Sequence, residues 1–476
     1  MSHDFTPRRE ALMSAATPQR SPESRAADDP AGSRPTATGP GLPRRAQART
    51  IAGGAVGTLM EYFDYYLYGL AAAAVFPQVF FSGNDPFVAQ LESFATFAVG
   101  FLFRPLGGVV FGYIGDRMGR KVTLLVTVIG MGLSTAAIGF IPPDHMIGLA
   151  APVLLLVMRM LQGLFVGGEM GGAATMVVEH APVGRRGLFG AFLISGAGVA
   201  NVLSAGMMAG LGLGPGSFFM TWGWRIPFVF SLVLSICAVL LRRQLQESEE
   251  FTTHTQEIEL GRIRRRSPIL EVLRHPRNTI LGILIGLPQS IAGYVVLTYG
   301  LSYMVSGGVP PQVGFLGTMI VGVLQIFVAP AYGALSDRVG RRRVYIAGCI
   351  GFALLVWPAF LLYGTHVPAL IWLGMVVGFV IPGVMMQGTL STLLTEMFDV
   401  EERTTGVNVG YQLSNTLGGG LAPFIATALV GWASGEIWPV IVYVVAICLI
   451  GAIATAAASI RPDTADAGRL RALETT

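Results

Sequence analysis

Several ionisable side chains lie inside long apolar stretches, and they are the residues of this sequence most able to do chemistry. Glu61 and Asp64 are three residues apart, so a helix would place them on one face, with Tyr65 and Tyr68 on the next turn. An ionised side chain at mid-membrane costs at least about 2.5–3.5 kcal/mol on insertion scales. Each of these acids is therefore expected to have a partner or a function.

Further polar residues would approach these acids from two other apolar stretches. Arg104 precedes a proline, which removes a backbone donor and can bend a helix there. Arg159, Gln162 and Glu169 fall on one side of a helix, because their spacing follows its period. Counted at about 1.5 Å per residue, Arg104 and Glu169 reach roughly the same depth as Asp64.

An arginine and two acids at one depth favour the binding of an anion together with a proton. A guanidinium can hold a carboxylate by two parallel hydrogen bonds while a neighbouring acid carries the proton. The alternative is structural, with Arg104 paired to Glu169 or Asp64 to neutralise buried charge. The two hypotheses are compatible, since a pair that opens when substrate or proton arrives would couple the two. We assign proton coupling first to Asp64, with Glu61 and Glu169 in reserve.

The second half of the chain carries uncharged polar groups in its apolar stretches. Such groups suit recognition of a hydroxyl, a carbonyl or a ring, and they could equally join neighbouring helices by hydrogen bonds. They are Gln289, Thr298, Tyr299, Ser302 and Tyr303, then Gln387, Gly388 and Ser391, and finally Asn408, Tyr411, Gln412 and Asn415. The residues predicted to bind a substrate are Arg104, Tyr65, Tyr68, Gln162, Gln289, Tyr299, Tyr303, Tyr411, Gln412 and Asn415.

The composition and the length of the apolar stretches indicate a polytopic membrane protein. Charged residues make up 13% of the 476 residues and apolar residues 52%, and there are 62 glycines. Twelve runs are long enough, at about 1.5 Å per residue, to cross a hydrocarbon core of about 30 Å. We therefore predict an all-α membrane protein with twelve transmembrane helices. The runs lie near 52–80, 91–114, 122–141, 149–178, 188–212, 223–241, 278–305, 312–334, 344–363, 369–397, 407–433 and 437–459.

A basic motif occurs twice and divides the chain into two similar bundles. Residues 115–121 read GDRMGRK and residues 336–342 read SDRVGRR, each between two apolar runs. Parallel repeats of this kind build one large class of transporters. We expect a disordered tail at 1–49, a six-helix bundle at 50–241, a linker at 242–277, a second six-helix bundle at 278–460 and a tail at 461–476.

Arginine is distributed unevenly among the connections between the runs. Alternate connections, beginning with that between the second and third runs, carry nearly all of it, and the other set has only Arg225, at a helix start. By the positive-inside rule, the arginine-rich connections and both termini are cytoplasmic. The basic motifs could also latch this side shut, through charge pairs or the dipole at a helix N-terminus, although a purely topogenic role is the alternative. The predicted gate comprises Asp116, Arg117, Arg120, Asp337, Arg338, Arg341 and Arg159.

Other residue classes argue against catalysis, metal binding and nucleic-acid binding. The net charge of +4 is too small to indicate a nucleic-acid partner. Cys237, Cys349 and Cys448 lie in apolar runs without C-x-x-C spacing, so neither a disulfide framework nor a metal site is expected. The six histidines fall in tails, loops or helix ends, and no H-E-x-x-H or G-x-S-x-G motif occurs. We expect no enzyme and no cofactor, with a proton gradient as the source of energy.

Taken together, the motifs resemble those of the major facilitator superfamily. Residues 115–121 are similar to its signature between the second and third helices, and residues 159–163 (RMLQG) to its R-x-x-Q-G motif in the fourth. More narrowly, the chain resembles the metabolite:proton symporter branch, which includes transporters of citrate, dicarboxylates, shikimate, proline and betaine. The motifs that carry this resemblance are 61–65 (EYFDY), 103–108 (FRPLGG), 167–169 (GGE), 185–187 (RRG) and 224–228 (WRIPF).

The resemblance spans roughly residues 51–460 and implies an inward proton-coupled symporter. Asp64, Arg104 and Glu169 are the candidates that match this branch. Two departures occur, since Asp399 stands where the branch usually has proline and Gln412 where it usually has asparagine. Because the eleventh helix faces the cavity in this superfamily, Gln412 affects the substrate more than the fold.

The combined expectation is a symporter that imports a small organic carboxylate or zwitterionic metabolite with protons. Its mid-membrane site would open alternately to the two sides of the plasma membrane. The alternative on the same fold is a proton-driven exporter of drugs or metabolites. The expected partners are the substrate, protons and the lipid bilayer, and the expected protein is a multi-pass monomer.

Overall fold

The computed structural model describes residues 44–118, 120–168, 181, 184–243, 276–398 and 403–460, and within these ranges each of the twelve apolar runs contains helix. These ranges contain no strand. Ten of the helices are long and apolar enough to cross a membrane, and an eleventh span consists of two helices bent by 41°. Helix α1 (Arg44–Ala74), which carries Glu61 and Asp64, corresponds to the first of the twelve predicted runs. The predicted all-α membrane fold is confirmed.

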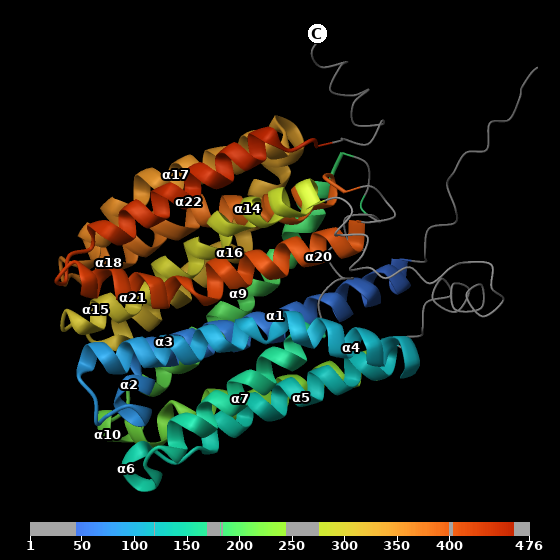
Figure 1. Cartoon of the computed structure of the whole chain (residues 1–476). Helices are drawn as coiled ribbons and strands as arrows, with labels where there is room; N and C mark the ends of the chain where they lie inside the picture. Colours follow the sequence, from blue (N-terminus) through green and yellow to red (C-terminus); the bar gives the residue numbers. More distant parts are fainter. Residues whose placement is uncertain are drawn as a thin grey trace, which may run out of the picture.

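The first six spans form one bundle, drawn in blue to green in Figure 1. Its second span is interrupted at Phe103, so that Pro105 lies in the first turn of a new helix, where a missing N–H costs nothing. The elements after α1 are α2 (Phe76–Phe80), α3 (Pro86–Leu102), α4 (Arg104–Met118), α5 (Arg120–Phe140), α6 (Asp144–Ile147), α7 (Ala150–Gly167), α9 (Arg186–Gly212), α10 (Gly216–Phe218), the π-helical turn η1 (Phe219–Gly223) and α11 (Arg225–Arg243).

The last six spans form the second bundle, drawn in yellow to red in Figure 1. Three of its spans contain a π-helical turn, a local widening that is often found at functional sites. The elements are α14 (Pro276–Gly293), η2 (Tyr294–Tyr299), α15 (Gly300–Ser306), α16 (Pro311–Val339), α17 (Arg341–Tyr363), α18 (Pro368–Met375), η3 (Val376–Val380), α19 (Pro382–Thr395), α20 (Arg403–Ser414), η4 (Asn415–Gly420), α21 (Ala422–Trp432) and α22 (Trp438–Ala457).

The first helix begins earlier than the apolar pattern indicated. Helix α1 starts at Arg44, inside the predicted tail, because arginine, alanine and glutamine favour helix although RRAQAR as a whole is not an apolar segment. The rest of that tail, nearly all of the predicted linker and the predicted C-terminal tail lie outside the described residues.

Large apolar side chains cover the outside of the protein. Phe327, Leu354 and Trp432 are 69% to 74% exposed, and they lie on strongly apolar spans. Exposing so much apolar surface to water would be unfavourable. Such side chains are stable where lipid replaces water, so the exterior fits a bilayer.

The two bundles contact one another along helices α9 and α16, which lie side by side between them (Figure 1). A Cβ atom at Gly198 would lie 2.9 Å from the carbonyl oxygen of Gly322, and one at Gly322 would lie 3.0 Å from the carbonyl oxygen of Gly198. Glycine at both positions therefore lets the two backbones touch.

The bundles also touch at both ends of this crossing. We call the end that carries Arg186 and Arg341 the arginine end; there, the Thr392 hydroxyl donates a hydrogen bond of 3.4 Å to the carbonyl oxygen of Arg186. At the opposite end, where Figure 1 shows α6, α10 and α15, the Gln312 side chain donates one of 3.0 Å to the carbonyl oxygen of Gly212. Each of these bonds joins one bundle to the other.

Candidate functional site

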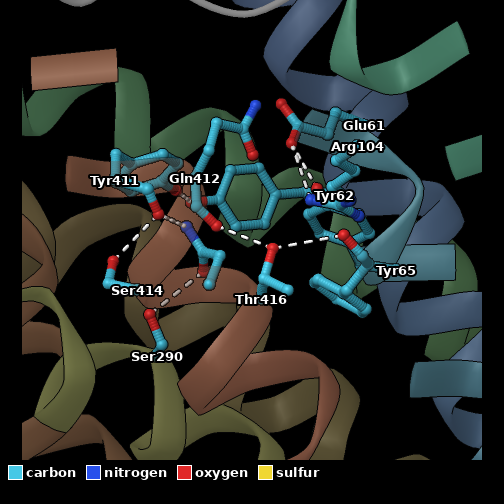
Figure 2. Close-up of polar contacts among 11 residues, drawn as sticks. Glu61, Tyr62, Tyr65, Arg104, Ser290, Tyr411, Gln412, Ser414 and Thr416 are labelled. Atoms are coloured by element: carbon cyan, nitrogen blue, oxygen red, sulfur yellow. Dashed lines mark hydrogen bonds and ion pairs between the residues drawn. The ribbon is translucent and has the colours of Figure 1, made fainter. Parts of the chain in front are cut away.

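An ion pair between Glu61 and Arg104 lies where the two bundles meet (Figure 2). The Nη1 atom of Arg104 is 3.6 Å from Oε1 of Glu61, and the two side chains are only 2% and 7% exposed. Glu61 also accepts a hydrogen bond from the hydroxyl of Tyr65, one turn further along α1. The sequence predicted Asp64 or Glu169 as the partner of Arg104; its ion pair in the structure is with Glu61, and Glu169 lies outside the described residues.

Two aromatic rings hold the guanidinium of Arg104 in place. Its Cζ atom is 4.0 Å from the ring centre of Tyr65 and 4.0 Å from that of Phe101. Cation–π contacts of this kind stabilise a buried guanidinium without using its N–H groups. In the described part of the chain, Nε and Nη1 of Arg104 have no hydrogen-bond acceptor. The guanidinium is thus fixed in position while two of its nitrogen atoms remain able to donate hydrogen bonds.

The backbone of helix α7 lies against that of the second span, and this contact sets the position of Arg104. A Cβ atom at Gly167 would lie 2.0 Å from the carbonyl oxygen of Arg104, and one at Gly163 would lie 2.0 Å from that of Gly100. Any larger residue at either position would push the helices apart. The glycines that follow Arg159 in the sequence therefore serve to bring the two arginine-bearing spans together.

Asp64 belongs to a second polar network, inside the first bundle. Its Oδ2 atom accepts hydrogen bonds from Thr135 on α5 (2.9 Å) and from Gln162 on α7 (3.0 Å). Arg159 in turn donates a bond of 2.5 Å to Gln162, and its Cζ atom lies 4.0 Å from the ring centre of Tyr68. The predicted gate residue Arg159 and the predicted substrate residues Gln162 and Tyr68 therefore all join the network of Asp64.

The two acids of α1 thus face different neighbours, although they are only three residues apart. Three residues turn a helix through about 300°, which leaves Glu61 and Asp64 about 60° apart around its axis. That angle is enough to direct Glu61 toward Arg104 and the second bundle, and Asp64 toward α5 and α7.

Contacts across the interface bring the second bundle into the same site. The hydroxyls of Tyr62 and Tyr411 share a hydrogen bond of 2.8 Å, and Thr416 donates one of 3.1 Å to the carbonyl oxygen of Phe101. The ring of Tyr294 packs edge-on against that of Phe101, with centroids 5.6 Å apart. Figure 2 shows Tyr62 between the Arg104 side and the Tyr411 side of the site.

The amide of Gln412 is the polar group of the second bundle with the clearest unmet hydrogen-bonding capacity. Gln412 is 8% exposed, and neither its Nε2 nor its Oε1 has a partner among the described residues. Its neighbour Asn415 is satisfied, because it donates to the carbonyl oxygen of Tyr411 (3.0 Å) and accepts from Ser290 (3.1 Å). A buried amide without partners is costly, so Gln412 is suited to a bound polar group.

Other predicted substrate residues have different neighbours or an unmet hydrogen-bonding group. The rings of Tyr299 and Tyr303 pack against Phe360 within the second bundle, at centroid distances of 6.1 Å and 5.5 Å. The side chain of Gln289 is buried, and its Oε1 has no partner in the described part of the chain.

Sequence reasoning missed residues that contribute through an aromatic ring or a single hydroxyl. Tyr62 and Phe101 are neighbours of the acids and the arginine that were selected. Thr135 lies in an apolar run that contains no charged residue, so nothing in that run indicated a site. For Tyr62 the signal was present, since it is the second residue of the EYFDY motif. The described residues contain no group of three or more His, Cys, Asp or Glu side chains able to hold a metal ion.

The second basic motif contacts the first bundle at the arginine end. Asp337 accepts hydrogen bonds from the backbone N–H groups of Gly187 (2.8 Å) and Leu188 (3.0 Å), in the first turn of α9. Arg341 pairs with Asp337 at 2.9 Å and with Glu396 at 3.0 Å. The side chains of the first motif's predicted gate residues, Asp116, Arg117 and Arg120, lie outside the described part of the chain.

Comparison with known proteins gives one consistent result. The family described as Major Facilitator Superfamily matches residues 54–324 and 307–475. The shikimate transporter of Escherichia coli (strain K12) is 38% identical over 410 residues, 85% of this chain and 92% of that protein. The proline/betaine transporter of Salmonella typhimurium (strain LT2) is 36% identical over 413 residues, 85% of this chain and 82% of that protein.

The solved structures agree on the fold. The crystal structure of a D-xylose-proton symporter superposes with a TM-score of 0.68 and covers 85% of this chain and 97% of its own. Its sequence is 20% identical, so it supports the architecture and leaves the substrate open.

Proposed function

The chain belongs to the Major Facilitator Superfamily, and we propose that it imports a small organic carboxylate or zwitterionic metabolite together with protons. Its similarity to proteins named as shikimate and proline/betaine transporters supports this proposal, because shikimate, proline and betaine all carry a carboxylate. The proton gradient would supply the energy, without a cofactor.

The observation that carries the proposal is the buried guanidinium of Arg104 at the interface of the bundles. Its Nε and Nη1 donors lack acceptors among the described residues, and its position is fixed by Tyr65 and Phe101. A planar guanidinium in such a place can bind a carboxylate through two parallel hydrogen bonds. We therefore assign the substrate's carboxylate to Arg104.

The second bundle would recognise the rest of the substrate through uncharged groups. Gln412 offers both a donor and an acceptor without partners in the described chain, and the hydroxyls of Tyr62 and Tyr411 lie at the same interface. Hydroxyl, carbonyl or ring substituents could satisfy these groups. A site shared by both bundles is suited to alternating access, since rocking of one bundle against the other would open it to either side.

We assign proton coupling first to Asp64. Its hydrogen bonds from Thr135 and Gln162, and the nearby Arg159, hold the ionised carboxylate in a defined place until a proton neutralises it. Neutralisation would weaken the attraction to Arg159 and so change how α1, α5 and α7 pack. Glu61 remains a candidate, and so does Glu169, which the structure does not describe.

The orientation we propose places the arginine end in the cytoplasm. The connections there carry nearly all of the arginine, and the positive-inside rule retains such connections on the cytoplasmic side. Both termini would then be cytoplasmic, in a monomer spanning the plasma membrane. Asp337, Arg341 and their partners would form the cytoplasmic gate, together with Arg338 and the first motif.

Uptake into liposomes tests the proposal. Purified protein is reconstituted, an inward proton gradient is imposed, and accumulation of labelled shikimate, proline and betaine is followed with and without a protonophore. We expect accumulation of at least one of the three above its external concentration, and loss of accumulation with the protonophore. Efflux driven by an inward proton gradient would favour the exporter instead, and absence of any gradient-dependent flux would refute the proposal.

A further inference from the structure

We propose that Glu61 occupies, in the empty carrier, the place on Arg104 that the substrate's carboxylate takes, and that Glu61 binds a proton when it is displaced. This inference rests on the proposed function and adds a second role for an acid of α1. Asp64 would couple the proton to movement of the bundles. Glu61 would couple a proton to binding itself.

The geometry of the ion pair suits a partner that leaves. The Nη1–Oε1 distance of 3.6 Å is beyond an ordinary charge-assisted hydrogen bond of about 2.7–2.9 Å. Arg104 is held by the rings of Tyr65 and Phe101, so its position does not depend on Glu61. Glu61 likewise keeps a hydrogen bond from Tyr65 that does not involve Arg104. Each partner can therefore remain in place when the pair separates.

The two acids of α1 differ in how directly a substrate between the bundles could reach them. Asp64 accepts hydrogen bonds from two side chains of its own bundle, on α5 and α7. Glu61 stands instead one residue before Tyr62, whose hydroxyl bonds to Tyr411 of the other bundle. A substrate bound between the bundles would reach the Glu61–Arg104 pair directly, and it would meet the network of Asp64 only through neighbouring side chains.

The charges around Glu61 explain why its displacement requires a proton. The ionisable groups that interact with it include Arg104 from α4, Tyr62 and Tyr65 from α1, Tyr411 from α20 and Tyr294 from η2. Arg104 is the cation among these five. Once a substrate carboxylate neutralises Arg104, Glu61 would be a buried anion beside a second anion, which is strongly unfavourable.

Neutralising Glu61 removes this conflict. A proton from solution adds to its carboxylate, and the substrate replaces it on the guanidinium, so the net charge of the pair is restored. Substrate binding should then consume one proton. By linkage, substrate affinity should fall about tenfold for each unit of pH over the range in which Glu61 is ionised in the empty carrier and protonated in the complex.

Equilibrium binding to the full-length protein tests the inference. Labelled shikimate and labelled proline are titrated into purified protein between pH 5.5 and 8.5, and calorimetry in two buffers of different ionisation enthalpy counts the protons taken up. We expect the unmodified protein to take up about one proton per bound molecule. Glu61→Gln should bind with an affinity that no longer changes with pH, at least as tightly at pH 8.5 as the unmodified protein.

Three variants serve as controls. Asp64→Asn should keep the pH dependence of binding, because that dependence is assigned to Glu61. Glu61→Asp keeps an acid at the position and should keep it as well. Glu436→Gln removes an exposed acid from the connection between α21 and α22 and should behave as the unmodified protein does.

The outcomes separate this inference from the proposed function. Binding with no proton uptake by the unmodified protein would overturn the role of Glu61 and leave carboxylate transport intact; this measurement needs no variant. A Glu61→Gln protein whose affinity still falls with pH would do the same. If neither probe binds and neither is accumulated, the proposed function fails and the inference fails with it.

Discussion

The carboxylate of Asp337 accepts a hydrogen bond of 2.8 Å from the backbone N–H of Gly187, and so a residue of the second bundle caps a helix of the first. The first N–H groups of a helix have no partner within it and carry the positive end of its dipole, which favours an anion there. This contact joins the bundles at the arginine end without any cation from the first bundle.

Removing this cap should loosen the arginine end. We expect Asp337→Ala to remove about 0.5–2 kcal/mol, the usual value of an N-cap, and so to raise the ratio of open to closed molecules about 2- to 30-fold. With spin labels at Val122→Cys and Arg343→Cys, in a background without native cysteines, the distribution of label-to-label distances should shift to larger values. Asp144→Ala is the control, since Asp144 accepts hydrogen bonds from Ser82 within the first bundle, at the opposite end. An unchanged distribution for Asp337→Ala would show that the cap does not hold this end closed.

Replacing Asp64 should stop net uptake, because the proton that couples to movement of the bundles is assigned to it, whereas the proton assigned to Glu61 affects binding. Asparagine can still accept hydrogen bonds from Thr135 and Gln162, so Asp64→Asn should fold, but it cannot bind a proton in this range of pH. We expect loss of uphill uptake while exchange of labelled for unlabelled substrate across pre-loaded liposomes continues. Uphill uptake at a normal rate would assign the coupling of proton and movement to a residue other than Asp64.

Replacing Arg104 should weaken the binding of carboxylates. Lysine keeps the charge but loses the planar fork and the stacking on Tyr65 and Phe101. Charge-assisted hydrogen bonds contribute about 1.5–3 kcal/mol, so we expect Arg104→Lys to lower substrate affinity about 10- to 150-fold. Arg225→Lys is the matched control, since Arg225 donates to the carbonyl oxygens of Gly139 and Ile141 within the first bundle. Near-normal affinity in Arg104→Lys would exclude this arginine from the site.

Changing Gln412 should alter substrate preference. If its unpaired amide binds a hydroxyl, Gln412→Leu should weaken shikimate binding by about 1–2 kcal/mol, or 5- to 30-fold, and affect betaine less, because betaine has no hydroxyl. Gln412→Asn provides the comparison, since it keeps an amide on a shorter side chain. Equal losses for shikimate and betaine would point to a packing defect instead.

Filling the crossing of α9 and α16 should destabilise the protein and slow transport. A Cβ atom at Gly198 would meet Ile326 at 2.8 Å and the Gly322 carbonyl oxygen at 2.9 Å, so Gly198→Ala forces the helices apart. Overpacking of this kind typically costs about 1–3 kcal/mol. A thermal unfolding scan should give a lower Tm for Gly198→Ala than for Gly210→Ala, because Gly210, on the same helix, has open space around it. Equal Tm values would contradict the close contact.

The sequence predicted the fold better than the site. Length and apolar composition determine which segments cross a bilayer, and the duplicated basic motif revealed the two bundles. Counting residues also predicted similar depths for Asp64 and Arg104. Depth does not determine direction around a helix axis, however, so the count could not show that Arg104 would pair with Glu61 while Asp64 turned to Thr135 and Gln162.

Some partners could not have been predicted because they depend on how helices from distant parts of the chain pack. The bond between Tyr62 and Tyr411 joins residues 349 positions apart, and the local sequence of neither tyrosine indicates the other as its partner. The cap on α9 was foreseen only as a general possibility for the basic motifs. Identifying Gly187 as the recipient required the actual contact between the bundles.

The hydrogen bonds from Thr392 to Arg186 and from Gln312 to Gly212 connect the bundles at opposite ends of the same molecule. In the alternating access that we propose, breaking one bond while keeping the other would open a single side, so each passage would require the bundles to move against one another. The flux per molecule would then be limited by microsecond-to-second conformational steps, orders of magnitude slower than diffusion through an open pore. Cells could raise the throughput of such a protein chiefly by making more copies of it.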